Sequence, residues 1–165
     1  MLNYLFSVEE HLLITFIASF LIVFMVGGVI YFWIIRKKIP FRQVAIALLA
    51  MTFAWAISDI LKRIFVTERP FMVNGQDPLT FTWPLDSSFP SNHASSAFAL
   101  ALSLRKSDKR LFLLYFIFAF VVSFGRVLSR VHYFFDVFVG ALIGISAVLI
   151  LERIGIEKFL KRIFD

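Results

Sequence analysis

LLITFIASFLIVFMVGGVIYFWII, residues 12–35, contains no charged side chain and is long enough to cross a lipid bilayer as a helix. Four further apolar stretches follow it, each ended by charged residues or by Gly and Pro: residues 44–61, 91–104, 111–128 and 131–151. We interpret all five as transmembrane helices, although the third is short and the fourth must include Arg126 to reach full length. The sequence therefore predicts an all-α, polytopic membrane helix bundle.

Composition supports this class and excludes several others. Of the 165 residues, 60% are hydrophobic and only 17% are charged, and the mean hydropathy of +0.86 lies well above that of soluble domains. No linker, repeat or low-complexity tract divides the chain, so we expect one integral-membrane domain over residues 1–165. The absence of cysteine excludes disulfides and thiolate metal sites. We attribute the net charge of +6 to basic residues that meet anionic lipid, and we expect no nucleic-acid partner.

Two terminal segments have an amphipathic character. Residues 1–11, MLNYLFSVEEH, have the mixed composition of an interfacial segment. Residues 153–164, RIGIEKFLKRIF, place Ile, Leu and Phe side chains mostly along one helical face and Lys and Arg along the other. We expect both segments to lie on the membrane surface.

The basic residues are distributed unevenly between the ends of the predicted spans. Twelve of the 17 follow the first, third and fifth spans, which therefore end on the same side. Because positively charged loops remain in the cytoplasm, we expect that side, with the C-terminus, to be cytoplasmic in a bacterial inner membrane. The opposite, periplasmic side holds only five basic residues: Lys62, Arg63, Arg69, Arg126 and Arg130. Topology does not require basic residues there, so we expect some of them to serve chemistry.

Three polar clusters, far apart in sequence, fall on this periplasmic side. They are KRIFVTERP at residues 62–70, PSNH at residues 90–93 and RVLSRVHYFFD at residues 126–136. A single Lys or Arg at the end of a span is more often an interfacial anchor than a ligand, and a lone His is about as often a packing residue as a functional one. Ionisable groups inside a membrane are costly, however, so the joint occurrence of three clusters favours a functional site.

The PSNH cluster has the pattern of a helix N-terminus. Ser91 is a candidate N-cap, which leaves the backbone amides of Asn92 and His93 without intrahelical partners. Free amides at the positive end of a helix dipole bind anions. The cluster therefore predicts a phosphate-binding site, with His93 beside it as an acid or base.

His132 and Asp136 are four residues apart at the start of the predicted fifth span, where they would share one helical face. A carboxylate that is hydrogen-bonded to one imidazole nitrogen fixes the tautomer and makes the other nitrogen more nucleophilic. We therefore predict that His132 is a nucleophile and that Asp136 is its partner. Lys62, Arg69 and Arg126 would neutralise the oxygens of a phosphoryl group during its transfer.

These motifs resemble those of the type 2 phosphatidic acid phosphatases, a family of integral-membrane lipid phosphatases related to vanadium haloperoxidases. The family pattern is K-x6-RP, then PSxH, then R-x5-H-x3-D, and this chain matches all three in order and spacing over about residues 60–150. The resemblance implies that His132 forms a phosphohistidine, that Asp136 supports it and that His93 protonates the leaving group. It implies no metal and no cofactor. The residues that it implies for holding the phosphate are Lys62, Arg69, Ser91 and Arg126, and we add Asn92 because of its free backbone amide.

The chain departs from the family pattern in three respects. Asn92 stands where Gly or Asp is common, and Gly125 stands where Ser often precedes the arginine of the third motif. Either change can alter substrate preference, but neither removes an ionisable catalytic group. Six spans are usual in the family, whereas we count five here.

The resemblance leaves several substrates open. We rank the 1-phosphate of lipid A and undecaprenyl diphosphate first, because this compact chain resembles those two branches; phosphatidylglycerophosphate and phosphatidate are alternatives. A non-enzymatic phosphate or phospholipid transporter component would need polar residues that continue down several spans, whereas the first, fourth and fifth spans become apolar directly below the motifs. A scaffold protein would leave His132 and Asp136 unexplained. Beyond the lipid substrate and the bilayer, we expect no obligate protein partner.

Overall fold

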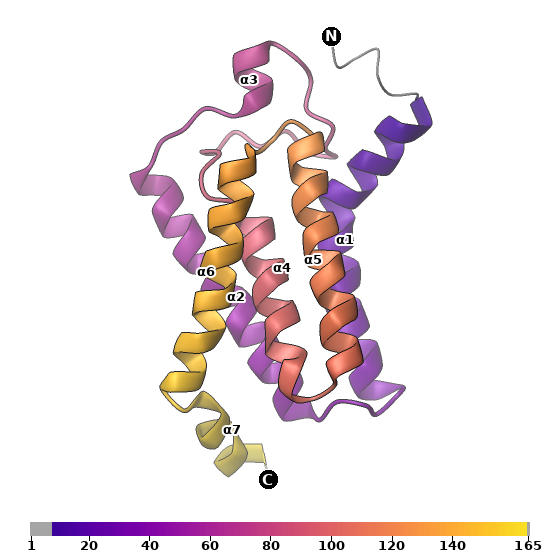
Figure 1. The fold of residues 1–165 in the computed structure, drawn as a ribbon, viewed down its shortest axis with the longest axis vertical. Helices are drawn as coiled ribbons and strands as arrows, with labels where there is room; N and C mark the ends of the chain where they lie inside the picture. The colour runs from indigo at the N-terminus through magenta and orange to yellow at the C-terminus, as the bar shows by residue number, and fades with distance from the viewer. Residues whose placement is uncertain (1–7, 165) are drawn as a thin grey trace.

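The computed structural model describes residues 8–164, and every regular element within them is helical (Figure 1). This confirms the all-α prediction. The first seven residues of the predicted interfacial segment lie outside the described residues, and the part from Val8 onward belongs to the first helix. In chain order the elements are α1 (Val8–Ile34), α2 (Phe41–Ile64), α3 (Pro70–Asn74), α4 (Asn92–Ser103), a 3₁₀ turn (Leu104–Lys106), α5 (Lys109–Leu128), α6 (Phe134–Arg153) and α7 (Ile156–Phe164).

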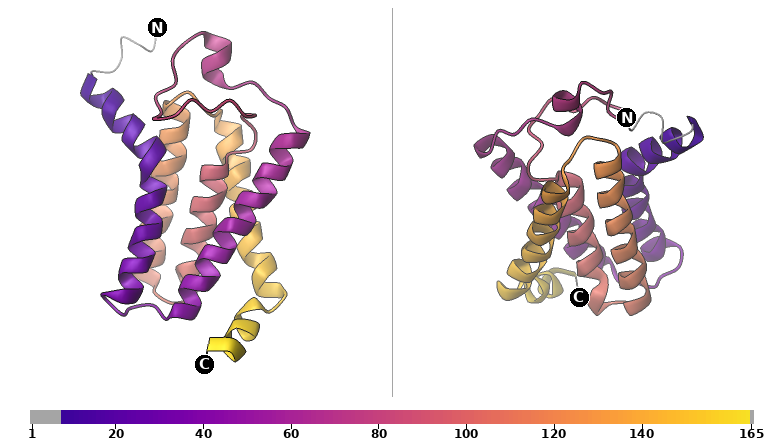
Figure 2. Two further views of the ribbon diagram at one scale, coloured as in Figure 1. Left: turned by 180° about the vertical axis from the view of Figure 1, so that it is seen from behind. Right: turned by 45° about the horizontal axis from the view of Figure 1, so that its top comes forward.

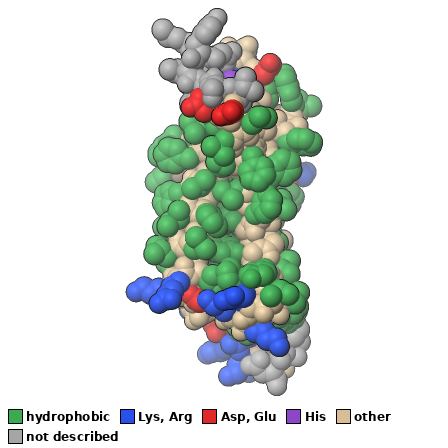
Figure 3. All heavy atoms as spheres, turned by 90° about the vertical axis from the view of Figure 1, so that its right-hand side faces the viewer, with side chains coloured by type: hydrophobic (Ala, Val, Ile, Leu, Met, Phe, Trp, Pro, Cys, Tyr) green, Lys and Arg blue, Asp and Glu red, His purple; other side chains and the backbone are tan. Residues whose placement is uncertain are grey.

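Four of the helices, α1, α2, α5 and α6, are long and apolar enough to cross a bilayer. On the face shown in Figure 3, hydrophobic side chains form a broad belt, and Lys and Arg side chains gather beyond it at one end of the molecule. Many of the exposed side chains are large Leu, Ile, Val and Phe residues. Because a continuous exposed apolar surface of this kind requires lipid around it, the chain is an integral membrane protein.

The third predicted span, α4, is the central helix of the bundle. It has 12 residues and packs against α2, α5 and α6 (Figure 1). Nine of its residues are buried, and most of these are Ala or Ser, whose small side chains let neighbouring helices approach closely. Since protein covers α4, its ends need not reach both membrane surfaces. Its N-terminus begins below the neighbouring ends of α5 and α6, inside the bundle (Figure 1).

Two glycines of α6 bring this N-terminus against the start of α6. A β-carbon at Gly140 would come within 2.7 Å of the carbonyl oxygen of Ser91, and one at Gly144 would collide with the carbonyl oxygen of Ser95. The amide of Ser91 also donates to the carbonyl of Asp136 at 3.1 Å. Glycine permits this approach because it has no β-carbon, and the PSNH motif is thereby held beside the start of α6.

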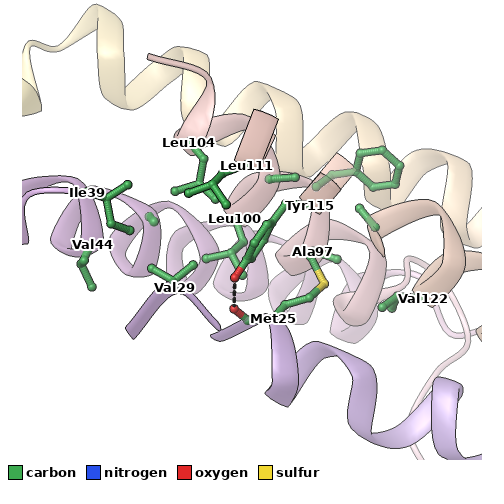
Figure 4. Packing of buried hydrophobic residues seen from close by; sticks show 14 residues of the cluster. Met25, Val29, Ile39, Val44, Ala97, Leu100, Leu104, Leu111, Tyr115 and Val122 are labelled. Atoms are coloured by element: carbon green, nitrogen blue, oxygen red, sulfur yellow. Dashed lines mark hydrogen bonds between the residues drawn. The ribbon is translucent and has the colours of Figure 1, made fainter. Parts of the chain in front are cut away.

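The other part of the core joins α1 to α5. Tyr115 of α5 lies among buried side chains of several helices, and its hydroxyl donates to the carbonyl of Met25 in α1 at 2.9 Å (Figure 4). Gly28 of α1 leaves room for this ring. Toward the end of the molecule that carries α3, α1 and α2 diverge (Figure 2, left). Side chains of both helices line a cavity at this end of the molecule.

The C-terminal residues form the amphipathic helix that their sequence predicts. Glu157 of α7 forms ion pairs with Arg42 at 3.9 Å and with Lys106 at 3.6 Å. These contacts tie α7 to the start of α2 and to the 3₁₀ turn, at the end of the bundle opposite α3 (Figure 1). The location of α7 on the membrane surface stays a prediction.

Candidate active site

A cavity of about 480 Å³ opens near the end of the bundle that carries α3. Its walls come from α1, α2, α4, the end of α5 and the segments that precede α4 and α6. The structure brings the three sequence clusters together here, and both imidazoles, His93 and His132, face the same cavity. Ser91 and Asp136 do not line it but are buried beside residues that do. Six of the eight residues predicted for the site line the cavity: Lys62, Arg69, Asn92, His93, Arg126 and His132.

Lys62 reaches the cavity from the last turn of α2. Its ammonium donates to the backbone carbonyls of Ser87 and Ser88 and lies 3.6 Å from a carboxylate oxygen of Asp86. The side chain is only 5% exposed, so water and salt screen its charge poorly. The two carbonyls fix this charge at the wall of the cavity.

Arg69 stands directly before α3 and is 2% exposed. Its Nε donates to the carbonyl of Asp86 at 2.9 Å, and its Nη2 donates to the Asp86 carboxylate at 2.7 Å and to the carbonyl of Ser87 at 3.2 Å. Its Nη1 donates to the carbonyl of Val131 at 2.6 Å and lies 3.5 Å from Nε2 of His132. These contacts hold the guanidinium beside the predicted nucleophile.

Arg126 lies in the last turn of α5 and is 6% exposed. Its Nη1 donates to the carbonyl of Ala18 at 2.8 Å, but its Nε has no acceptor, and no carboxylate of residues 8–164 lies within ion-pair distance of it. A buried cation without an anion is costly unless a ligand supplies one. Gly125 allows α1 to come this close, because a β-carbon there would lie 2.7 Å from Ile17. The packing of α1 therefore accounts for glycine where the family often has serine.

The start of α4 is the helix N-terminus that the PSNH cluster predicts. Ser91 is the N-cap, and its hydroxyl accepts from the amide of Ala94 at 3.4 Å. The amides of Asn92 and His93 have no acceptor within residues 8–164. Because both residues line the cavity, the positive end of the α4 dipole is directed toward it.

The predicted geometry of His132 and Asp136 is wrong in one respect. The helix α6 begins at Phe134, so His132 lies before the helix and does not share a helical face with Asp136. The helix begins there because the Asp136 carboxylate accepts the amide of Tyr133 at 2.8 Å, which caps the first turn. The same carboxylate accepts from the hydroxyl of Ser88 and lies 3.4 Å from Nδ1 of His132. The two side chains are adjacent, but through the turn before the helix.

The orientation of the His132 ring gives its two nitrogens different surroundings. Nδ1 faces the Asp136 carboxylate without forming a hydrogen bond, and Nε2 faces Arg69. Nε2 is therefore the nitrogen available to a phosphorus atom. Burial lowers the pKa of His132 below its ordinary value, and the nearby cations lower it further, although the Asp136 carboxylate opposes them. The lowered pKa keeps the imidazole neutral at neutral pH, as a nucleophile must be.

The charges around the cavity do not balance. Three buried cations, Lys62, Arg69 and Arg126, and two carboxylates, those of Asp86 and Asp136, lie at or beside the cavity, which leaves an excess of one positive charge. Such an excess at the wall of a cavity favours the binding of an anion. In the described part of the chain, no group of three His, Cys, Asp or Glu side chains could hold a metal ion. The arrangement suits a tetrahedral oxyanion between the cations and the start of α4.

Two residues of the site were not predicted from the sequence. Asp86 pairs with both cations of the first motif, and Ser88 donates to the Asp136 carboxylate. Both belong to the run DSS at residues 86–88, just before the PSNH motif. The only signal for them in the sequence was the polar character of this run. Their partners could not be predicted from local spacing, because the contacts join residues that lie 17 to 48 positions apart.

Fold and site together define a helical integral membrane protein with a cavity near one end of the bundle that is lined by buried cations and two histidines. Residues 43–158 match the PAP2 superfamily. Since this match covers most of the chain, the protein belongs to the PAP2 superfamily, which confirms the family resemblance of its motifs.

Several known proteins are similar to this chain. LpxE of Aquifex aeolicus, a crystal structure, is 29% identical with a TM-score of 0.71, over 92% of this chain and 90% of that one. The crystal structure of a transmembrane PAP2-type phosphatidylglycerolphosphate phosphatase from Bacillus subtilis shares the fold at 22% identity and a TM-score of 0.56, over 88% and 77% of the two chains. The bacitracin transport permease protein BcrC of Bacillus licheniformis is 28% identical over 134 residues, which are 81% of this chain and 66% of that relative, just under two thirds of its length.

Proposed function

We propose that this protein is a lipid phosphatase that hydrolyses a phosphate monoester or diphosphate of a membrane lipid. The observation that carries the proposal is the placement of Arg126, a buried cation without an acidic partner among the described residues, at the same cavity as His132. The cation needs an anion, and Nε2 of His132 is oriented to attack one. Membership of the PAP2 superfamily supports this activity.

The proposed reaction consists of two displacements at phosphorus. In the first, the lone pair on Nε2 of His132 forms a bond to phosphorus, the bond from phosphorus to the lipid oxygen breaks, and His93 gives a proton to that oxygen. In the second, His93 takes a proton from water, the water oxygen bonds to phosphorus, and the phosphohistidine bond breaks to release phosphate. Asp136 stabilises the positive charge that the His132 ring acquires.

The remaining site residues hold the phosphoryl group. The side chains of Lys62, Arg69 and Arg126 and the free amides at the start of α4 neutralise the oxygens as charge builds up in the transition state. Ser91 contributes by capping α4, which keeps those amides in place. Since these cations supply the charge that a metal ion would otherwise supply, we expect no metal requirement.

The lipid chain has a place beside the phosphate. The amide of Phe81 donates to the hydroxyl of Ser19 at 3.0 Å, so the segment between α3 and α4 is tied to α1 across the end of the bundle. Below this tie, α1 and α2 diverge (Figure 2, left), and side chains of both helices line the cavity, so we infer that the lipid enters sideways from the bilayer between them. The apolar side chains that line this part of the cavity are Ile22, Val23, Val26, Met51 and Trp55.

The choice of lipid and of membrane face follows the family resemblance. The 1-phosphate of lipid A and undecaprenyl diphosphate are the favoured substrates, and phosphatidylglycerophosphate and phosphatidate carry the same chemistry. The Lys and Arg side chains gather at the end of the molecule opposite the cavity (Figure 3). By the positive-inside rule, this supports a periplasmic site in a bacterial inner membrane, with a cytoplasmic C-terminus.

Phosphate release from the four lipids, assayed side by side with purified protein, tests the proposal. His132→Ala should abolish release without lowering the melting temperature, whereas His11→Ala, away from the cavity, should keep wild-type rates. Vanadate, which mimics the five-coordinate transition state, should inhibit, and EDTA should not. Release from none of the lipids would end the proposed function, and wild-type rates in His132→Ala would end the assignment of the nucleophile.

Transport is a second candidate function, because the similar protein from Bacillus licheniformis is named a bacitracin transport permease. A transport path needs polar groups along its length. Here the charged residues lie at one end of the cavity, and its extension between α1 and α2 is apolar apart from Ser19 and Thr52. Uptake of labelled bacitracin by proteoliposomes separates the two functions: we expect none, and uptake that persists in His132→Ala would favour transport.

A further inference from the structure

We propose that Asp86 is an internal anion that holds the cations of the site when no phosphate is bound, and that a substrate phosphate must displace it. This inference rests on the proposed function, because it concerns the phosphate that the site would bind. Asp86 belongs to none of the three motifs. Its role is to set the affinity of the site for phosphate, without taking part in bond making.

The carboxylate of Asp86 bridges the two cations of the first motif. One of its oxygens accepts from Nη2 of Arg69 at 2.7 Å, and the other lies 3.6 Å from Nζ of Lys62. The oxygens of a phosphate group, like those of a carboxylate, accept charge-assisted hydrogen bonds from guanidinium and ammonium groups. Asp86 therefore occupies the contacts that two phosphate oxygens would need.

Backbone carbonyls, His132 and Asp86 surround the donor groups of the two cations. The five N–H groups of Arg69 are directed at three backbone carbonyls, at Nε2 of His132 and at the Asp86 carboxylate. The ammonium of Lys62 donates to two backbone carbonyls and forms an ion pair with the same carboxylate at 3.6 Å. The carbonyls belong to the folded backbone, so the carboxylate is the charged partner that can leave by rotation of a side chain.

Burial distinguishes Asp86 from the other charged groups. Its side chain is 54% exposed, whereas Lys62 and Arg69 are 5% and 2% exposed. Although burial alone would raise the pKa of Asp86, Lys62 and Arg69 hold it below its ordinary value, so the carboxylate is charged at neutral pH. Asp136, the other acidic group of the site, is 4% exposed and accepts two hydrogen bonds. Asp86 can therefore turn into water, whereas Asp136 stays in place.

The departure of Asp86 would match the charge of the site to its ligand. With Asp86 in place, three cations and two carboxylates leave one positive charge; without it, three cations and Asp136 leave two. A phosphate monoester carries close to two negative charges at neutral pH. A bound phosphate can thus balance the buried cations that Asp86 balances only in part.

The substitution Asp86→Asn tests this role, with Asp77→Asn as the matched control. Asparagine keeps the size of the side chain and an oxygen that can accept from Arg69, but it removes the competing charge. Asp77 is exposed in the same segment between α3 and α4 and does not line the cavity. Binding of inorganic phosphate and of dimethyl phosphate, a monoanion, is measured by the rise in melting temperature with ligand concentration.

We expect Asp86→Asn to bind both anions about tenfold more tightly than the wild type, as the loss of a competing charge-assisted contact implies, and Asp77→Asn to bind them as the wild type does. The gain should be similar for both anions, because Asp86 leaves in both cases. A much larger gain for phosphate would mean that Asp86 stays beside the bound anion and would overturn displacement. Unchanged or weaker binding would make Asp86 a structural brace and would also overturn the proposal.

A second variant keeps the test decisive if asparagine lowers the melting temperature. Asp86→Ser removes the charge and leaves room for water, and it should tighten the binding of both anions in the same way; weaker binding in this variant as well would count against displacement. The measurement does not depend on turnover. If the wild-type protein hydrolyses no lipid, the proposed function is wrong. The comparison of anion binding by Asp86→Asn and Asp77→Asn can still be interpreted in that case.

Discussion

Replacing Arg126 by Met should leave the empty protein about as stable as before, or more stable, while it removes most of the phosphate binding. Arg126 is 6% exposed, and its Nε has no acceptor. Methionine is unbranched and flexible and fills a buried space without carrying a charge. A residue kept only for structure would behave in the opposite way, because its loss would destabilise the fold.

The expected magnitudes follow from the contacts of Arg126. The substitution removes one charge-assisted hydrogen bond, to the carbonyl of Ala18, which contributes roughly 1.5–3 kcal/mol. It also removes a buried charge without an anion, and replacing buried ionic groups by apolar ones often gains about 1–4 kcal/mol. The two effects offset each other, so the free energy of unfolding should change by no more than about 2 kcal/mol. Two lost hydrogen bonds to a phosphoryl group should lower kcat/KM by about 10²- to 10⁴-fold.

The assay combines the melting temperature, with and without vanadate, and the kcat/KM for phosphate release. Vanadate should raise the melting temperature of the wild type but hardly that of Arg126→Met. The matched control is Arg63→Met, because the Arg63 side chain is 80% exposed and pairs with Asp59 outside the cavity. We expect this control to keep both the vanadate effect and the activity.

A marked fall in the melting temperature of empty Arg126→Met, together with an undiminished vanadate effect, would refute the reasoning. Arg126 would then serve to hold α1 through the carbonyl of Ala18. The anion would be balanced by Lys62 and Arg69 alone.

Three further expectations concern the histidine and the packing behind it. Because burial lowers the pKa of folded His132, the unfolded chain takes up the proton first as the pH falls below about 6.5. As the pH falls through that range, the melting temperature of the wild type should therefore decrease relative to that of His132→Asn. An increase relative to His132→Asn would contradict the lowered pKa. Gly144→Ala should separate α4 from α6, at a cost of about 1–3 kcal/mol in unfolding free energy, and lower the activity. Gly27→Ala is the control, because a β-carbon there meets no atom within 4 Å, and it should hardly change the unfolding free energy. Equal effects of Gly144→Ala and Gly27→Ala would argue against a close approach of α4 and α6. Ser88→Ala should lower kcat about tenfold with little change in KM, because the Asp136 carboxylate loses a hydrogen bond that positions it; an unchanged kcat would exclude that role.

Much of the fold could be predicted because the chemistry that decides it is local. A bilayer accepts a backbone only when its hydrogen bonds are made within the segment, so a long apolar stretch must be a helix, as α1, α2, α5 and α6 are. The cap at Ser91 and the amphipathic α7 could be predicted for the same reason, since each depends on residues within a few positions. The short length of α4 could not be explained from its hydropathy, because it depends on the helices that cover it.

The prediction for His132 failed where a tertiary contact competed with a helical pattern. A spacing of four residues from Asp136 suggests one helical face, but the carboxylate accepts the amide of Tyr133, and the helix begins after His132. The partners of the carboxylate could not be read from spacing. Ser88, one of them, lies 48 residues away.

The sequence by itself determined the class of the protein, the course of its long helices and the residue types of the site, because hydropathy, capping and motif content depend on neighbours along the chain. Only the tertiary structure decided that Asp86 pairs with Lys62 and Arg69, that Nε2 of His132 faces Arg69 while Nδ1 faces Asp136, and that side chains of α1 and α2 line the cavity. These distances depend on how closely distant helices pack. Contacts such as that of Gly140 with the carbonyl of Ser91 set them, and no pattern in a single stretch of sequence contains that information.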